Sequence, residues 1–231
     1  MSGVFWGYKA GLIPCFAGHV QLLITNHTLC SIMAKPPAKD QWVELEQRVQ
    51  AMLPMPPNEW EAFAAIWQPF TARRKAVLTP AGTTERYLYF VTQGVQRAYF
   101  ETADGRQATI LFTYPYSFSG LLDSFLLQKP SGFTLETLTQ SQFLRCHYAA
   151  FSTLQVQYPA IMQMVLAGTA HAMSGVLDRL AQIQCYTAQE KFKALLTRSP
   201  HVLNLIPHKY LANYLGIDPA TFSKLLAAVR L

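Results

Sequence analysis

The chain has 231 residues, of which 51% are hydrophobic and only 14% are charged. This composition supplies enough apolar material for a buried core and excludes a largely disordered protein. The length fits one large domain or two small ones. The net charge of +6 permits nucleic acid as a partner, and residues 187–231 concentrate it, with six Lys or Arg against two acidic residues.

The cysteines argue against a metal centre and against a disulfide framework. Cys15, Cys30, Cys146 and Cys185 are scattered, with no C-x-x-C pair and no cluster with histidine. We therefore expect no metal, no cofactor and a reducing, cytoplasmic compartment.

The N-terminal residues 1–38 differ in composition from the rest of the chain. Residues 1–32 carry a single charge, Lys9, and polar or turn residues such as Pro14 and Gly18 interrupt the apolar run. No stretch there reaches the ~18 apolar residues of a membrane span, and no clear signal-peptide pattern is present. Met33 opens a polar segment, so three readings stay open: a misassigned start, a loosely attached extension, or a targeting signal. We expect no membrane association.

Residues 39–158 change from helical to strand periodicity. Two amphipathic helices are predicted first, with inner faces at Trp42, Leu45, Val49 and Met52 and then at Trp60, Phe63, Ala64 and Trp67. Between Thr71 and His147 come short runs rich in Val, Ile, Tyr, Phe and Thr, separated by turn signals. This spacing is typical of an antiparallel sandwich or barrel-like roll.

A long helix is predicted over residues 159–186. Its apolar positions recur every three or four residues with one longer gap: Ile161, Val165, Ala172, Val176, Leu180 and Ile183. Such a seam needs a partner surface. That surface is either the roll alone or the same helix of a second copy, and we favour the second copy.

The most specific motif begins at His208 and has the pattern of a helix-turn-helix. Apolar residues fall at the spacings of a two-helix unit: Leu211, Leu215, Ile217, Phe222 and Leu225. Ala212 stands where the two helices cross, and Gly216 stands at the turn, where a left-handed backbone suits glycine. Asp218 can cap the second helix, and Pro219 fits its first position.

This motif predicts contacts with double-stranded DNA. The exposed N-terminal residues of the second helix would face base edges: Ala220, Thr221, Ser223 and Lys224. Lys209 and Arg230 are predicted to contact phosphates, which position the protein without specifying sequence. The plainer alternative is a helical hairpin with solvated charges.

Together these elements resemble the Crp/Fnr family of transcription regulators over Asp40 to Leu231. Glycines of a cyclic-nucleotide-binding-like domain carry part of the resemblance: Gly82, Gly94, Gly105 and Gly120. The resemblance implies an α+β fold with a β-roll at 39–158, a dimerisation helix at 159–186 and a DNA-binding domain at 187–231. It also implies a homodimer, an unknown small-molecule effector and RNA polymerase as a partner.

The effector region departs from nucleotide-binding relatives. In those members a glutamate follows the glycine that matches Gly120, and an arginine about eleven residues later holds the phosphate. Here Leu121 follows, and residues 129–134 contain no arginine. Ser131, Gly132 and Thr134 could still line a small pocket with Gly120 and Leu121. The effector is therefore expected not to be cAMP or cGMP.

Other sensor and enzyme chemistries find little support. Cys15 and Cys30 are too far apart for the family's iron–sulfur motif, and His147 and His171 lack a haem-binding pattern. A cupin-like metal enzyme would need clustered histidines and a glutamate on the strands, and we expect no catalytic residues. The alternative function is a cyclic-nucleotide-binding module without a DNA role.

Overall fold

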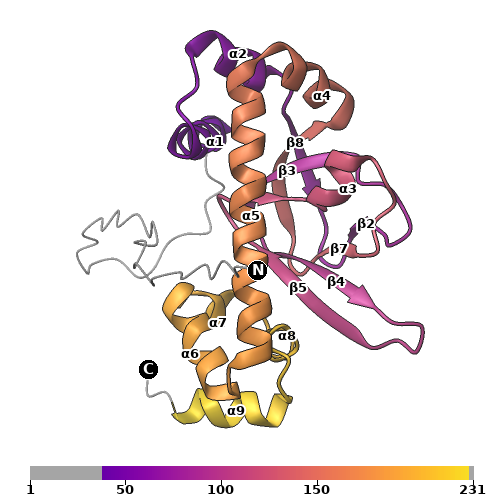
Figure 1. Cartoon of the computed structure of the whole chain (residues 1–231), viewed down its shortest axis with the longest axis vertical. Coiled ribbons are helices and arrows are strands. Elements are labelled where there is room, and N and C mark those ends of the chain that lie inside the picture. The colour runs from indigo at the N-terminus through magenta and orange to yellow at the C-terminus, as the bar shows by residue number, and fades with distance from the viewer. Residues whose placement is uncertain (1–37, 229–231) are drawn as a thin grey trace, which may run out of the picture. The chain divides into compact units, whose positions relative to one another are not determined.

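The computed structural model describes residues 38–228, so all but the last residue of the predicted extension over residues 1–38 lies outside the described residues, and so does Arg230. The described residues belong to one compact unit. The described part begins with helices α1 (Ala38–Met52) and α2 (Pro57–Ala65), where Pro57 occupies the first helical turn. Both helices lie where the sequence periodicity predicted them, and Figure 1 shows them beside the upper part of the long helix.

Two four-stranded antiparallel sheets form the β-roll. One has the strand order β1-β8-β3-β6 and the other β2-β7-β4-β5. The strands are β1 (Gln68–Ala72), β2 (Val77–Thr79), β3 (Tyr87–Gln93), β4 (Gln96–Glu101), β5 (Gln107–Thr113), β6 (Phe118–Ser119), β7 (Thr134–Thr137) and β8 (Ser141–His147). A short helix, α3 (Leu122–Leu127), follows β6, and α4 (Tyr148–Gln157) follows β8. The predicted antiparallel roll is confirmed.

The turn between β3 and β4 requires glycine. Gly94 has a φ of +92°, and a Cβ atom there would lie 2.4 Å from the hydroxyl of Ser141 and 2.5 Å from the carbonyl of Gln140. Any side chain would therefore clash with the turn that precedes β8. This close approach lets the two sheets meet at the roll's corner.

Two apolar clusters stabilise this part of the molecule. The first joins α1, α2, α4 and the start of the long helix to one sheet, with Leu45, Phe63, Phe90 and Ile161 fully buried. The second fills the interior of the roll, and its buried members are Ala72, Tyr89, Val91, Ala98, Leu121, Leu135 and Phe143. Because aromatic and aliphatic side chains occupy the interior, the roll is itself a packed core.

The long helix α5 (Pro159–Cys185) has two different faces. Ile161 is buried and Val165 is packed against the first cluster, whereas Val176, Leu180 and Ile183 are 59%, 49% and 49% exposed. The predicted single seam is therefore divided: its first residues pack inside the protomer and its last residues lie on the surface. The helix is also long and apolar enough to cross a membrane by length and composition, and 17% of its most apolar window is buried.

The C-terminal helices build a third cluster. They are α6 (Ala188–Arg198), α7 (Val202–Leu205), α8 (His208–Leu215) and α9 (Pro219–Ala228). A capping box between Thr187 and Glu190 starts α6. The rings of Phe192 and Phe222 meet edge to face at 5.3 Å between centroids, which fixes α6 against α9. The proposed boundary between this part and the roll stays a prediction.

Candidate functional site

The helix-turn-helix forms at α8 and α9 with the local geometry that the sequence predicts. Gly216 ends α8 with φ 64° and ψ 37°, in the left-handed region. The N–H groups of Gly216 and Ile217 donate to the carbonyls of Asn213 and Ala212, both at 3.1 Å, and satisfy the end of α8. Ala212, at the helix crossing, is buried.

The N-terminus of α9 is capped as predicted. The Asp218 carboxylate accepts hydrogen bonds from the N–H groups of Ala220 at 2.7 Å and Thr221 at 3.4 Å. Pro219 is the first residue of the helix, where its missing N–H leaves no partner unpaired. The cap fixes the direction in which α9 starts after the connection from α8.

The proposed DNA-contacting residues differ in exposure. Ala220, Ser223 and Lys224 are exposed on α9, and the last two follow Ala220 by three and four residues, hence on its side of the helix. Thr221 is half-buried and is therefore less available than predicted. Lys209 is exposed on α8, with its Nζ 4.8 Å from the centre of the Tyr210 ring. The described part of α9 thus exposes small, uncharged side chains at Ala220 and Ser223, followed by the basic side chain of Lys224.

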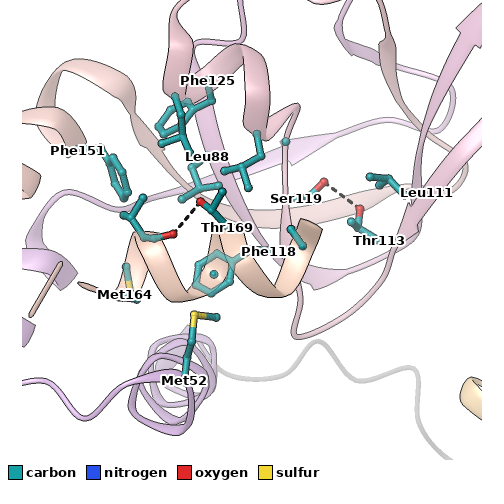
Figure 2. Close-up of a pocket in the computed structure, with 16 residues that line it drawn as sticks. Met52, Leu88, Leu111, Thr113, Phe118, Ser119, Phe125, Phe151, Met164 and Thr169 are labelled. Atoms are coloured by element: carbon teal, nitrogen blue, oxygen red, sulfur yellow. Dashed lines mark hydrogen bonds between the residues drawn. The ribbon is translucent and has the colours of Figure 1, made fainter. Parts of the chain in front are cut away.

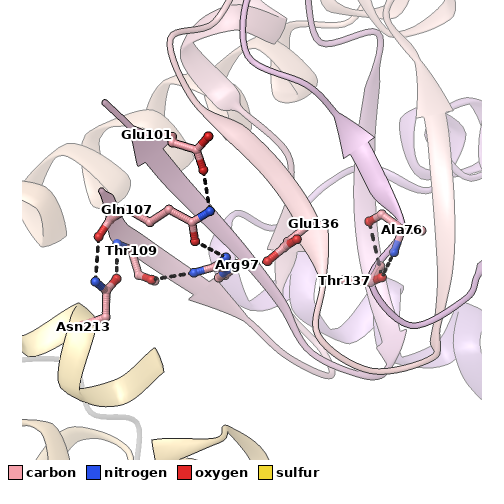
Figure 3. Close-up of polar contacts among 8 residues, drawn as sticks. All are labelled: Ala76, Arg97, Glu101, Gln107, Thr109, Glu136, Thr137 and Asn213. Atoms are coloured by element: carbon pink, nitrogen blue, oxygen red, sulfur yellow. Dashed lines mark hydrogen bonds and ion pairs between the residues drawn. The ribbon is translucent and has the colours of Figure 1, made fainter. Parts of the chain in front are cut away.

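Helix α8 is bound to the roll by a bidentate amide. The Oδ1 atom of Asn213 accepts from the N–H of Thr109 at 2.7 Å, and its Nδ2 donates to the carbonyl of Gln107 at 2.7 Å (Figure 3). Asn213 therefore pairs with the edge of β5 as another strand would. Nothing in the local sequence indicated this contact, since the partners are more than a hundred residues apart.

Two arginines add to this attachment. The guanidinium of Arg97 in β4 lies between the rings of Tyr99 and Tyr210, at 4.2 and 4.4 Å from their centres. The guanidinium of Arg179 in α5 lies 4.1 Å from the centre of the Tyr214 ring and donates to the Tyr214 carbonyl. These cation–π contacts attach α8 to both the roll and the long helix.

The five residues proposed for an effector pocket have different surroundings, and the pocket stays a prediction. Leu121 is buried in the roll's core, and Gly132 is exposed. The hydroxyl of Ser131 accepts from the N–H of Phe133 at 3.0 Å, and that of Thr134 accepts from the N–H of Ala81 at 3.2 Å. These hydroxyls stabilise loops. Of the five, only Gly120 lines the apolar cavity that lies between the roll and α5.

A buried carboxylate that the sequence reasoning missed lies beside Leu121. Glu85 is 1% exposed and accepts from the Thr79 hydroxyl at 2.8 Å, the Tyr87 N–H at 3.1 Å and the Leu121 N–H at 3.4 Å. Burial raises the pKa of Glu85, and the three donors act in the opposite direction. When ionised, Glu85 would repel a phosphate placed near Leu121.

We therefore expect that calorimetry with cAMP or cGMP detects no binding at physiological concentrations. The reasons are the missing arginine, the packed interior of the roll and the carboxylate of Glu85. A micromolar dissociation constant for either nucleotide would contradict this prediction.

Residues 38–228 also contain possible metal ligands and nucleophiles. No group of three His, Cys, Asp or Glu side chains in residues 38–228 is close enough to hold a metal ion. Cys146 is buried, and burial raises the pKa of its thiol, which disfavours a thiolate nucleophile. His147 accepts the N–H of Ala149 at 3.2 Å and so caps α4.

Comparisons by sequence gave no result: no protein-family model matches the chain, and no curated protein matches it. Solved structures match by fold. FixK2 from Bradyrhizobium japonicum is 18% identical, with a TM-score of 0.64 over 71% of this chain and 84% of its own. The c-di-GMP responsive global regulator CLP from Xanthomonas campestris is 15% identical, with a TM-score of 0.57 over 76% and 92%.

A mutant of CooA from Carboxydothermus hydrogenoformans is also similar, at 15% identity and a TM-score of 0.57 over 71% of this chain and 76% of its own. These identities establish a shared fold. The chain has the fold of the Crp/Fnr regulators, a cyclic-nucleotide-binding-like roll followed by a long helix and C-terminal helices, and the predicted fold class is confirmed.

Proposed function

We propose that the chain is a DNA-binding transcription regulator of the Crp/Fnr type, in which the roll controls a dimeric helix-turn-helix. The observation that carries the proposal is the α8–α9 unit, with its left-handed Gly216, its cap at Asp218 and its exposed Lys224. Such a unit places the N-terminal residues of its second helix in the major groove. The neighbours with the same fold include a global regulator.

The partner of α5 in this proposal is a second copy of the chain. Along α5, one row of surface residues recurs at alternating spacings of four and three: Met162, Leu166, Thr169, Met173, Val176, Leu180 and Ile183. The apolar members are 45–70% exposed. A sustained 3–4 alternation is the heptad pattern of a two-stranded coiled coil. A two-fold dimer would place two α9 helices ~34 Å apart on a palindromic site.

A lipid environment for α5 is the alternative that its composition allows. A membrane span would be apolar on all sides, whereas α5 has Asp178 and Arg179 in its last third, and Arg179 binds the Tyr214 carbonyl. The heptad seam favours self-association instead. We therefore propose a cytoplasmic dimer that binds promoter DNA, acts with RNA polymerase and responds to a small-molecule effector.

The first test is the salt dependence of DNA binding by Lys224→Ala. If Lys224 contacts a base edge, its loss weakens specific binding by about 1–3 kcal/mol and leaves binding to random DNA unchanged. If it contacts only phosphate, all duplexes are bound more weakly and the slope of log affinity against log salt falls by about one. Fluorescence anisotropy with promoter and random duplexes measures both quantities.

Lys129→Ala is the matched control, because Lys129 is an exposed lysine between α3 and β7, outside the C-terminal helices. It removes the same charge and is expected to leave binding to both duplexes unchanged. Equal affinities for wild type and a folded Lys224→Ala variant would refute the assignment of α9. If wild type bound no duplex at all, the alternative of a regulatory module without a DNA role would be favoured.

A further inference from the structure

An apolar cavity lies between the roll and α5. Its volume is about 230 Å³, and its walls come from α1, β3, β5, β6, α3, α4 and α5 (Figure 2). Among the described residues that line it, none is charged. A dry apolar cavity of about 150 Å³ already accepts benzene, so this one has room for two fused rings. It differs from the nucleotide-like region, because Ser131, Gly132 and Thr134 do not line it.

One polar group in this cavity has a free acceptor, as its hydrogen bonds reveal. The Ser141 hydroxyl donates to the Thr139 carbonyl at 3.0 Å, so it must accept from Nε2 of Gln96 at 2.9 Å. The Gln96 oxygen then accepts the single hydrogen of Thr113 at 2.8 Å. The bond of 2.9 Å between Thr113 and Ser119 therefore takes its hydrogen from Ser119.

This order of bonds leaves lone pairs on the oxygen of Ser119, which is 4% exposed and lines the cavity. A ligand that enters can donate one hydrogen bond to that oxygen. An anion would lose its hydration there without gaining a cation, since the surrounding side chains are neutral. The site thus selects against phosphates and carboxylates and for neutral molecules with one donor.

We propose that this cavity binds an uncharged, mainly apolar aromatic molecule of about two fused rings that donates one hydrogen bond to Ser119. Thr169 lines the cavity and also occupies a position of the α5 heptad seam, so the bound ligand would touch the helix that pairs the two copies. A role as the effector site rests on the proposed function, whereas ligand binding itself does not.

Calorimetry on the full-length chain with three probes tests the proposal. Indole is neutral, bicyclic and carries one donor, and we expect it to bind. Indene has the same shape without the donor, so its affinity is expected to be about fivefold lower, the factor for one neutral hydrogen bond. Indole-3-carboxylate is expected not to bind in the same concentration range.

Two glycines of α5 provide a matched pair of variants. Gly168 lines the cavity, where an added Cβ would lie 3.5 Å from the Met52 sulfur, whereas Gly175, one heptad later, has open space. Gly168→Leu fills the cavity and is expected to abolish indole binding, and Gly175→Leu is expected to preserve it. Ser119→Ala is expected to bind indole and indene equally well.

The proposal is overturned if wild type does not bind indole, if the carboxylate binds as tightly as indole, or if Gly168→Leu binds it like Gly175→Leu. Circular dichroism checks folding; should Gly168→Leu be unfolded, the probe comparison in Ser119→Ala decides. Duplex binding without ligand is measured in parallel. Its absence would overturn the regulator assignment, while indole binding would still support the cavity.

Discussion

The double variant Val176→Glu, Leu180→Glu is expected to be a monomer at micromolar concentration, whereas the wild type is expected to be a dimer. Both side chains are about half exposed on the α5 seam, and in a coiled coil they would face their own copies. Four buried carboxylates at the pair axis would repel one another and lose hydration without a partner. Light scattering measures the change directly.

The loss of pairing is expected to weaken binding to a palindromic operator by about 100-fold or more, because linked binding of two half-sites contributes about 10²–10⁴ in affinity. Ser174→Glu, Ala181→Glu is the matched control: both residues are exposed on α5, one heptad apart and off the seam. It adds the same charge and should remain dimeric. A wild type that is monomeric with and without DNA would rule out the coiled-coil proposal.

The sequence located α5 correctly but assigned its outward face only in part. Val176, Leu180 and Ile183 are exposed as a dimer seam requires, yet Ile161 and Val165 pack inside the protomer, and Met162 and Leu166 take the outward positions instead. Neighbouring apolar residues made both registers possible. The packing of α1, α2 and α4 against α5 decides which residues face inward, and these are tertiary contacts.

Strand β1 shows a second kind of limit. Its sequence, Gln68–Ala72, contains Pro69, which argues against a strand in the middle of a sheet. The structure places β1 at the edge of its sheet, paired only with β8, where a missing N–H is tolerated. Pro69 therefore argued against a strand in the sequence, although a proline is compatible with the edge position that β1 occupies.

The turn chemistry of the helix-turn-helix was predictable because it is local. Gly216 and Asp218 act on atoms within a few residues, and both adopt the expected geometry. The apolar cavity and the contact of Asn213 with β5 were not predictable, since both join segments far apart in the chain. The predicted contacts with DNA stay predictions, and so does the effector pocket around Gly120.

The ion pair between Arg97 and Glu136 is the other feature whose loss should have a large effect. The two side chains are 5% and 13% exposed, with 2.6 Å between Nε and Oε1. Arg97 also donates to Gln107 at 2.8 Å (Figure 3). Its guanidinium lies 4.4 Å from the centre of the Tyr210 ring of α8. One buried cation therefore links β4, β7, β5 and the first helix of the helix-turn-helix.

Glu136→Ala is expected to reduce the free energy of unfolding by about 3 kcal/mol, because it leaves a buried guanidinium without its counter-charge. Gln107 still accepts one of its hydrogen bonds, which places the loss at the lower end of that range. Removing both charges is expected to cost less: Arg97→Met, Glu136→Leu should be more stable than Glu136→Ala. Urea denaturation of the three proteins measures these differences.

The exposed pair Arg106–Asp104 provides the control, since its N···O distance of 2.8 Å is similar but its side chains are 80% and 59% exposed. Asp104→Ala is expected to have little effect, because water and salt screen an exposed pair. If Glu136→Ala were no less stable than Asp104→Ala, the buried pair would not stabilise the roll. Suppose that only Glu136→Ala loses stability and that the double variant recovers it. The cost would then come from leaving the buried Arg97 without a counter-charge, and the ion pair itself would contribute little net stability.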